Sequence, residues 1–292
     1  MPGLCEGRVC IVTGAGRGIG REHALALAAE GAHVVANDYD ATGAEKVVGE
    51  IVARGGSAIA SCGDVADWEY AAELVRAATD RWGRLDALVN NAGFVRDRML
   101  VSMTEQQWDD VVRVHLKGHA APLQHAAAYW RQRAKAGEPV AARVVNTTSG
   151  AGLLGSVGQA NYAAAKAGIV ALTQVAAVEL QSYGVTVNAI APAARTQMTE
   201  GVFASMAKPE SGFDAMDPAN VSPLVVWLAS EESGGVTGRV FEVEGGVISV
   251  ATGWRHGPQE DKGARWDPAE VGAVVGRLLA QAPVPEPVYG AS

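Results

Sequence analysis

Short apolar runs rich in valine, isoleucine and alanine alternate with longer helix-like segments along almost the whole chain. Near-continuous apolar runs of this kind are typical of parallel strands that are covered on both faces. Strict alternation of strand and helix favours an α/β fold with right-handed crossovers. We therefore predict a doubly wound, parallel, seven-stranded sheet of Rossmann type with helices on both faces. The expected strands are residues 8–14, 33–38, 57–64, 85–91, 143–149, 185–192 and 239–246, and the expected helices lie near 20–30, 42–54, 67–82, 104–136, 157–183 and 218–230.

The last part of the chain departs from this alternation. No repeat or internal linker interrupts residues 1–253, so these are expected to form one domain, followed by a C-terminal extension over residues 254–292. Within the extension, Asp267 as N-cap, Pro268 at the first position and Glu270 predict one short helix. The proline-rich end APVPEPVYGAS is expected to be extended. It covers part of the sheet, lies on a neighbouring subunit, or is a free end.

A glycine-rich turn follows the first expected strand directly. The segment TGAGRGIG (residues 13–20) places Gly14, Gly18 and Gly20 before the first expected helix. Glycines there let the backbone approach a pyrophosphate, while the amides at the start of the helix face its negative charge. The spacing differs from G-x-G-x-x-G, and a tight strand-to-helix connection is the alternative interpretation. The position after the first strand of an alternating series favours a dinucleotide site.

Asp38 ends the second expected strand, 24 residues after Gly14. A carboxylate at this place accepts hydrogen bonds from the adenosine ribose of NAD, and it would repel the 2′-phosphate of NADP. Arg17, in the glycine turn, argues for NADP because a guanidinium pairs with such a phosphate. A carboxylate directly at the ribose should outweigh a flexible arginine, so we predict NAD. The alternatives are that Asp40 has this role and that Asp38 is an ordinary turn residue.

A tyrosine and a lysine stand four residues apart in the alanine-rich segment NYAAAKAG. On a helix, Tyr162 and Lys166 point the same way, one turn apart. A tyrosine pKa of about 10 is too high for a base at neutral pH, but a fixed ammonium nearby lowers it. Ser149 ends the fifth expected strand and would hydrogen-bond a substrate oxygen that gains negative charge. Together they predict proton exchange with a substrate alcohol; a solvated helix face is the alternative.

These motifs resemble the short-chain dehydrogenase/reductase family over residues 8 to about 246. The matching motifs are TGxxxGIG at 13–20, Asp64-Val65, Asn90-Asn91-Ala92-Gly93, Tyr162-x-x-x-Lys166, and Ser149 13 residues before the tyrosine. The resemblance implies an oxidoreductase with a nicotinamide cofactor, whose ribose Lys166 would also hold. The expected cofactor-binding residues are Gly14, Arg17, Gly18, Ile19, Gly20, Asp38, Asp64, Val65, Asn91, Ala92, Gly93, Tyr162, Lys166, Pro192 and Thr196.

Further segments narrow the resemblance. VVANDYD, VHLKG, GQANYAAAK and IAPAARTQMT look most like the (3R)-hydroxyacyl-CoA dehydrogenase domains of multifunctional β-oxidation enzymes and like related actinobacterial hydroxysteroid dehydrogenases. NAGFVRDRML equally resembles 3-oxoacyl-carrier-protein reductases. The family's usual Pro-Gly after the sixth strand is Pro192-Ala193 here, and Thr196 comes one residue early. Backbone contacts to the nicotinamide carboxamide are therefore expected to differ in detail.

His115 stands where many members of the resembled family carry an asparagine that holds a water linking the lysine to solvent. An imidazole also holds a water, and it carries a proton near neutral pH. The neighbours Val111, Val114 and Gly118 place His115 on an inward face, where burial beside an ammonium favours its neutral form. We predict a proton relay in which His115 approaches Lys166 through one water. A buried, hydrogen-bonded histidine is the alternative.

Two apolar loops are expected beside the site. Apolar and methionine-rich linings favour an apolar substrate over a sugar, and a fatty acyl thioester and a steroid fit equally well. Simple packing of a lid helix is the alternative. The residues are Leu153, Leu154 and Val157 after the fifth strand, and Met198, Val202, Phe203, Met206, Phe213 and Met216 after the sixth.

Composition argues against several other classes of protein. A net charge of −8 disfavours binding to nucleic acid. No apolar run approaches the roughly 20 residues of a membrane helix, and no secretory signal precedes the first strand. The three cysteines, Cys5, Cys10 and Cys62, match no zinc pattern, so we expect no metal. They predict reduced thiols in a cytoplasmic protein.

The long helix patterns at 104–136 and 157–183 carry apolar residues at outer positions, which together with the resemblance predicts a homodimer or homotetramer. The resulting hypothesis is an NAD-dependent oxidoreductase that interconverts a secondary alcohol and a ketone on a 3-hydroxyacyl-CoA or a hydroxysteroid. The alternatives are an NADPH-dependent 3-oxoacyl reductase and a dinucleotide-sensing regulator without catalysis. Intact Ser149, Tyr162 and Lys166 speak against the sensor.

Overall fold

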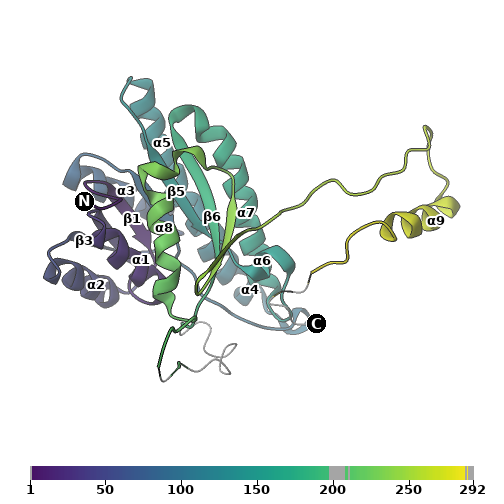
Figure 1. The fold of residues 1–292 in the computed structure, drawn as a ribbon, viewed down its shortest axis with the longest axis horizontal. Coiled ribbons are helices and arrows are strands. Elements are labelled where there is room, and N and C mark those ends of the chain that lie inside the picture. Colours follow the sequence, from purple (N-terminus) through teal and green to yellow (C-terminus); the bar gives the residue numbers. More distant parts are fainter. Residues whose placement is uncertain (1, 197–207, 210, 287, 289–292) are drawn as a thin grey trace.

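A computed structural model describes residues 2–196, 208–209, 211–286 and 288. Within this part of the chain, one eight-stranded sheet has the order β3-β2-β1-β4-β5-β6-β7-β8 (Figure 1). The chain starts in the middle of the sheet and winds outward in both directions, which confirms the predicted doubly wound α/β fold of Rossmann type. The strands are β1 Val9–Thr13, β2 His33–Asp38, β3 Ser57–Cys62, β4 Ala87–Asn90, β5 Ala142–Thr147, β6 Val185–Ala193, β7 Val240–Glu244 and β8 Val247–Val250.

Helices cover both faces of the sheet, as predicted. Successive side chains of a strand point to opposite faces, so Cys10 and Val12 of β1 pack in one core with α1, α2 and α8. Val9 and Ile11 pack in the other core with α3, α5 and α7. The α-helices are α1 Gly18–Ala29, α2 Ala41–Ala53, α3 Trp68–Trp82, α4 Glu105–Val112, α5 Gly118–Lys135, α6 Gly150–Leu154, α7 Ala160–Leu180, α8 Ser222–Ala229 and α9 Pro268–Leu279.

The predicted helix 104–136 is interrupted. A π-helical turn over Arg113–Lys117 separates α4 from α5, with His115 at its centre. The α4 start is well defined, because Thr104 and Gln107 form a capping box. A π turn accommodates an extra residue and is common at functional sites. Its presence changes the direction of the side chains that follow, which a uniform helical periodicity does not predict.

The prediction of seven strands was wrong by one strand. The alternation was expected to break after Gly246, yet Val247–Val250 form β8, which pairs antiparallel with β7. Gly245, at a φ of +53°, and Gly246 form the two-residue turn between them. Two strands joined by two glycines are a hairpin pattern. β8 is an edge strand, and all four of its residues are exposed.

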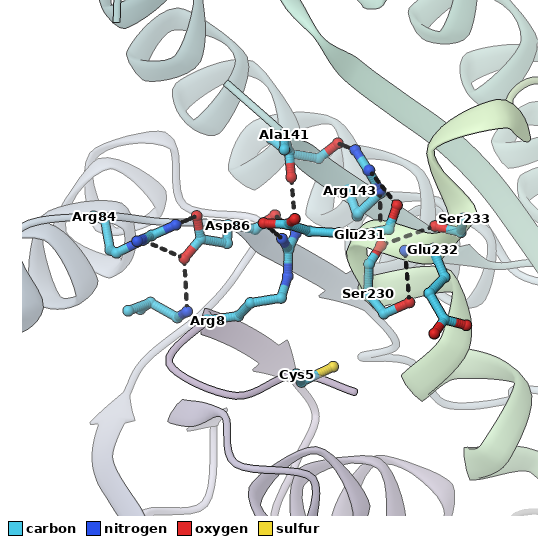
Figure 2. Close-up of polar contacts among 12 residues, drawn as sticks. Cys5, Arg8, Arg84, Asp86, Ala141, Arg143, Ser230, Glu231, Glu232 and Ser233 are labelled. Atoms are coloured by element: carbon cyan, nitrogen blue, oxygen red, sulfur yellow. Dashed lines mark hydrogen bonds and ion pairs between the residues drawn. The ribbon is translucent and has the colours of Figure 1, made fainter. Parts of the chain in front are cut away.

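The amino ends of the strands are held together by a buried arginine network (Figure 2). The Arg8 guanidinium donates to the carbonyl oxygens of Ala141 at 2.8 Å and Asp86 at 3.1 Å. The Asp86 carboxylate in turn accepts from Arg84 and from the Val9 amide. These bonds join β1, β4 and the segment before β5. They lie at the edge of the sheet where the strands begin.

The C-terminal extension runs away from the sheet, with α9 near its far end (Figure 1). α9 starts with the predicted capping box of Asp267 and Glu270. Its Val271, Val275 and Leu279 are exposed. In the structure α9 therefore does not cover the sheet of its own chain. The alternatives for the proline-rich end, which are a place on the sheet, a place on a neighbouring subunit and a free end, remain predictions, as does the domain boundary after residue 253.

One described helical segment, Ala160–Tyr183, is long and apolar enough by length and composition to cross a membrane. The sequence analysis identified no such stretch. The same test is passed by core helices of globular proteins, and one face of this helix packs against the sheet through Ile169, Thr173 and Ala176. The segment also carries Tyr162 and Lys166.

Candidate active site

The three predicted catalytic residues gather where β5 ends and α7 begins. Lys166 is buried on α7, and its ammonium donates to the Thr147 carbonyl at 2.6 Å. The Thr148 hydroxyl donates to the Lys166 carbonyl at 2.7 Å. Ser149 follows directly in the chain. These two bonds dock the carboxyl end of β5 onto the helix turn that carries the lysine.

Burial makes the charged form of Lys166 less favourable than that of an exposed lysine. Removal from solvent lowers its pKa to about 7. Its ammonium nitrogen lies 5.5 Å from the centre of the Tyr162 ring, so the cation faces the π-system of the predicted acid/base. The arrangement predicted from the spacing of the two residues, with the ammonium beside the tyrosine ring, is present.

Ser149 is positioned by a helix that was not predicted. It is the N-cap of α6, and its hydroxyl oxygen accepts from the Ala151 amide at 3.2 Å. The residue is 5% exposed. Since the oxygen accepts from the backbone, the hydroxyl hydrogen is left to donate to a substrate oxygen.

Asn161 is a positioning residue that the sequence analysis missed. It is fully buried, and its side-chain amide donates to the carbonyl oxygens of Arg96 at 3.2 Å and Gln107 at 2.9 Å. Its side-chain oxygen accepts from the Tyr162 amide at 2.8 Å. Asn161 thereby ties the start of α7 to the segment after β4. Its place directly before the tyrosine was the available signal.

His115 is buried and in contact with Tyr162. The two rings meet edge to face, with centroids 5.1 Å apart. Nε2 lies 2.6 Å from the Phe94 carbonyl oxygen and 3.1 Å from the Phe94 amide nitrogen. The shorter contact favours a hydrogen on Nε2 that donates to the carbonyl, which leaves the lone pair to Nδ1. Among the described residues, Nδ1 has no hydrogen-bond partner. Burial and the Lys166 charge lower the His115 pKa to about 3, although the bond to Phe94 opposes this.

This geometry contains elements of both interpretations of His115. The Nε2 bond is that of a buried structural histidine, and Gly93 is required beside it because a Cβ there would lie 2.2 Å from the imidazole Cε1. Nδ1 is the atom that would accept a water from the lysine side. The relay stays a prediction.

Exchanging His115 for asparagine is expected to preserve turnover, because an amide can hold the same water. His115→Leu should instead lower kcat severalfold at neutral pH, with a smaller loss in melting temperature. Both quantities should be measured for both variants. A Leu variant with normal turnover, or an Asn variant as impaired as Leu, would make His115 a packing residue.

A second buried histidine, His119, was not singled out from the sequence. Its ring is fully buried, and burial and the Lys166 charge lower its pKa well below the usual value. The His119 carbonyl accepts from the Asn90 side chain at 3.3 Å, and Asn90 also donates to Asn146 at 3.0 Å. A polar layer of His119, Asn90 and Asn146 thus lies close enough to Lys166 for the lysine charge to act on His119. The four-residue spacing of His115 and His119 was the signal for it.

The glycine turn is a close-packed cradle. Gly14 and Gly18 have φ of +64° and +55°, and a Cβ on Gly20 would lie 2.1 Å from the Gly14 carbonyl oxygen. The Thr13 hydroxyl accepts from the Asn91 amide at 2.9 Å and the Ala92 amide at 3.1 Å. The second predicted cofactor loop, Asn91 to Gly93, is thereby held against the first.

Asp38 lies next to the glycine turn. Its carboxylate accepts from the Gly16 amide at 2.8 Å and from the Asp40 amide at 2.9 Å. Asp40 has a different role, because its carboxylate caps the start of α2 by accepting a hydrogen bond from the Thr42 amide. Of the two candidates for the ribose-binding carboxylate, Asp38 is therefore the better placed.

The other predicted cofactor residues surround this turn. Asp64 forms an ion pair with Arg113 at 2.6 Å, and Val65 is buried. Thr196 lies beside Gly18, since a Cβ on that glycine would be 3.5 Å from its methyl group. The remaining placements are Arg17 as N-cap of α1, Ile19 in the first turn of α1, and Pro192 near the end of β6.

The apolar residues predicted around the substrate divide into two groups. Leu154, Val157 and Phe213 are exposed, at 43%, 87% and 65%, and are available to a ligand. Leu153 is half-buried. Met216 is buried, so the packing interpretation holds for Met216. Met198, Val202, Phe203 and Met206 lie outside the described residues.

The family model described as short chain dehydrogenase matches residues 8–207. The chain belongs to the short-chain dehydrogenase family. The predicted resemblance is confirmed, and the chain is an oxidoreductase of this family. A crystal structure of a short chain dehydrogenase from Mycobacterium avium has a TM-score of 0.91 and 59% identity, covering 99% of this chain and 100% of that one.

Curated relatives have two kinds of name. The hydroxyacyl-CoA dehydrogenase ChsB1 of Mycobacterium tuberculosis is 46% identical over 92% of this chain and 88% of its own length. The mouse peroxisomal multifunctional enzyme type 2 is 40% identical over 85% of this chain and 32% of its own length. A 3-oxoacyl-[acyl-carrier-protein] reductase of Synechocystis is 41% identical over 82% of this chain and 97% of its own length.

Family membership implies a nicotinamide dinucleotide, and the residues present fit one. A side chain on Gly14 would lie 2.8 Å from the Ala92 backbone, so the turn admits backbone only. Asp38 stands at the tip of β2 for a ribose. Among the described residues, the buried Lys166 ammonium donates one hydrogen bond, to the Thr147 carbonyl, which leaves N–H donors for ribose hydroxyls.

Proposed function

We propose that this protein is an NAD-dependent dehydrogenase that interconverts the secondary alcohol of a 3-hydroxyacyl-CoA and the corresponding ketone. The observation that carries the proposal is the position of the Lys166 ammonium, which contacts the Tyr162 ring and the Thr147 carbonyl two residues before Ser149. Asp38 lies beside the glycine turn. The names of the hydroxyacyl-CoA dehydrogenase and multifunctional-enzyme relatives support the acyl thioester.

The three residues divide the proton chemistry between them. The Ser149 hydroxyl donates to the substrate oxygen, and the Tyr162 phenolate takes the hydroxyl proton as the alcohol is oxidised. The Lys166 ammonium favours the phenolate and holds the ribose. The nicotinamide ring, when bound, supplies the acceptor for the hydride that leaves the substrate carbon.

NAD is favoured because a carboxylate stands where the adenosine ribose is expected. The Asp38 carboxylate would accept hydrogen bonds from the ribose hydroxyls and repel a 2′-phosphate. The alternative is an NADPH-dependent 3-oxoacyl reductase, which the Synechocystis relative and the segment NAGFVRDRML favour. A catalytically silent dinucleotide sensor is disfavoured, because it would need none of the three catalytic side chains.

The deciding experiment is a cofactor-reduction assay with NAD and NADP against a panel of 3-hydroxyacyl-CoA and steroid alcohols. We expect reduction of NAD with 3-hydroxyacyl-CoA. Turnover that requires NADP would favour the reductase. Turnover of steroids alone would reject the acyl substrate, and binding of dinucleotide without turnover of any alcohol would favour the sensor.

We propose that the protein is a homodimer or homotetramer assembled through the outer face of α7. Val175 and Val178 are 54% and 78% exposed there. On α5, by contrast, Leu123 and Trp130 of the predicted outer surface are buried in the core. An apolar helix face of this kind marks an interface.

Light scattering at micromolar concentration should give a mass above the 30.2 kDa of one chain. Val178→Lys should shift the distribution toward the monomer, because a charge in the interface is costly. Val52→Lys, on α2 and 55% exposed in the wild type, is the matched control and should leave the mass unchanged. A monomeric wild type would contradict the proposal.

We also propose a cytoplasmic location. The three cysteines are free thiols, and burial raises the pKa of Cys5 to about 11. Free thiols are typical of reducing compartments. Fractionation that places the protein outside the cytoplasm would reject this.

A further inference from the structure

A hollow lies beside the start of α7, the helix that carries Tyr162 and Lys166. It has a volume of about 380 Å³ and is lined by Asp97, Arg98, Met99, Ser102 and Gly158. Its walls come from the segment after β4 and from the loop between α6 and α7. None of these five residues has a part in the proposed chemistry.

Hydrogen bonds join the hollow to the residues just before α7, the helix that carries Tyr162. The Arg98 amide donates to the Gly158 carbonyl at 2.8 Å, and Arg98 forms a parallel bridge with Gln159. The Gln159 side chain donates to the Asp97 carboxylate at 3.0 Å. Through these bonds Arg98 is attached to the backbone just before Tyr162.

Arg98 offers an uncommitted guanidinium. Its side chain is exposed, and among the described residues it makes no hydrogen bond or ion pair. The neighbouring carboxylate of Asp97 is engaged by Gln159 instead. The guanidinium carbon of Arg96, two residues earlier, lies 4.7 Å from the centre of the Phe94 ring. That guanidinium is therefore already engaged in a cation–π contact. The planar fork of an arginine matches two phosphate oxygens.

The surroundings of Arg98 are apolar. Met99, Leu100 and Val101 are 56%, 69% and 94% exposed, and Val157 is 87% exposed on the neighbouring loop. A ligand that follows this surface would pass from the catalytic tyrosine along apolar side chains to one cation. A coenzyme A thioester has this order of groups, because an uncharged pantetheine arm separates the thioester from the phosphates.

We infer that the hollow lined by Asp97, Arg98, Met99, Ser102 and Gly158 binds the phosphate-bearing portion of the substrate's coenzyme A, with the Arg98 guanidinium on its phosphates. The inference rests on the proposed function. A steroid alcohol carries no phosphate for Arg98 to bind. An acidic carrier protein is less suited, since the chain carries a net charge of −8 and Glu105, Asp109 and Asp110 follow the hollow closely.

The test compares two thioesters of the same 3-hydroxy acid, one on coenzyme A and one on N-acetylcysteamine, which has no phosphate. For Arg98→Gln we expect kcat/KM to fall about tenfold or more with the coenzyme A thioester, through KM, because a charged hydrogen bond is lost. The loss should be absent with the N-acetylcysteamine thioester. Arg98→Lys should recover part of it, and added salt should shrink the difference.

Arg76→Gln is the matched control, since Arg76 is also an exposed arginine but lies on α3, away from the hollow. A readout independent of turnover is calorimetric titration of free coenzyme A into enzyme saturated with NADH. Its affinity should fall with Arg98→Gln and stay unchanged with Arg76→Gln. Saturation with NADH keeps the adenine nucleotide out of the cofactor site.

Each other outcome overturns the inference in a recognisable way. Equal losses with both thioesters would make Arg98 a structural residue, and no loss with either would remove it from phosphate binding. With the acyl-carrier-protein thioester of the same acid as a third substrate, a loss confined to that thioester would assign the surface to a carrier protein. A wild type that turns over no acyl thioester would reject the proposed function itself, whereas the first three outcomes leave that function standing.

Discussion

Replacing Tyr162 with phenylalanine is expected to lower kcat by about two to four orders of magnitude, the usual contribution of a general acid/base. The affinity for the dinucleotide should be nearly unchanged. The phenylalanine ring can keep the edge-to-face contact with His115 and remain beside the Lys166 ammonium. The substitution therefore removes the proton-transfer group and little else. Stopped-flow turnover and fluorescence titration of the reduced cofactor measure the two quantities.

Tyr129→Phe is the control for this experiment. This substitution also removes a phenol hydroxyl. In the wild type, that hydroxyl accepts a hydrogen bond from Arg133 on α5 at 2.9 Å and lies outside the candidate site. The kcat of the Tyr129→Phe variant should match the wild type. If Tyr162→Phe keeps more than a tenth of the wild-type kcat, tyrosine is not the acid/base and the assignment of the site must change.

Asp38→Ala is expected to weaken NAD binding by about tenfold or more, because a charged hydrogen bond contributes about 1.5–3 kcal/mol. The preference for NAD over NADP should narrow further, since the charge that repels the 2′-phosphate is removed as well. Part of the loss will come from the turn itself, because Asp38 also accepts from the Gly16 amide. Kd values for both reduced cofactors give the ratio.

Two variants separate these contributions. Asp38→Asn keeps one oxygen acceptor but removes the charge, so a changed ratio there isolates repulsion of the phosphate. Asp40→Ala removes the α2 cap and should cost about 0.5–2 kcal/mol of stability without changing the ratio. Unchanged NAD affinity in Asp38→Ala would assign the ribose to Asp40 or to neither residue.

The fold and most of the site could be predicted because their signals are local. Parallel strands buried on both faces require continuous apolar runs, and these runs located all seven parallel strands. The conformations of Gly14 and Gly18 suit glycine and few other residues, so the turn is visible in the sequence. Tyr162 and Lys166 are neighbours on one helix, and their spacing alone brings them together.

Other features depend on contacts between distant segments. The π turn at His115 interrupts a sequence whose periodicity is helical throughout. Asn161 positions Tyr162 through carbonyl oxygens of Arg96 and Gln107, far away in the chain. His119 lies near Lys166 because α5 packs on β4 and α7. No local propensity encodes such meetings.

From the residues alone one can deduce the alternating sheet, the dinucleotide turn and the chemical type of the acid/base, since backbone conformation and helix spacing act over a few residues. Only the folded structure determines the pKa values of the ionisable groups in the site. Burial is a property of the assembled layers, and burial lowers the pKa of Lys166 to about 7 and that of His115 to about 3. The choice between Asp38 and Asp40 is likewise tertiary, because one carboxylate meets the glycine turn while the other caps a helix.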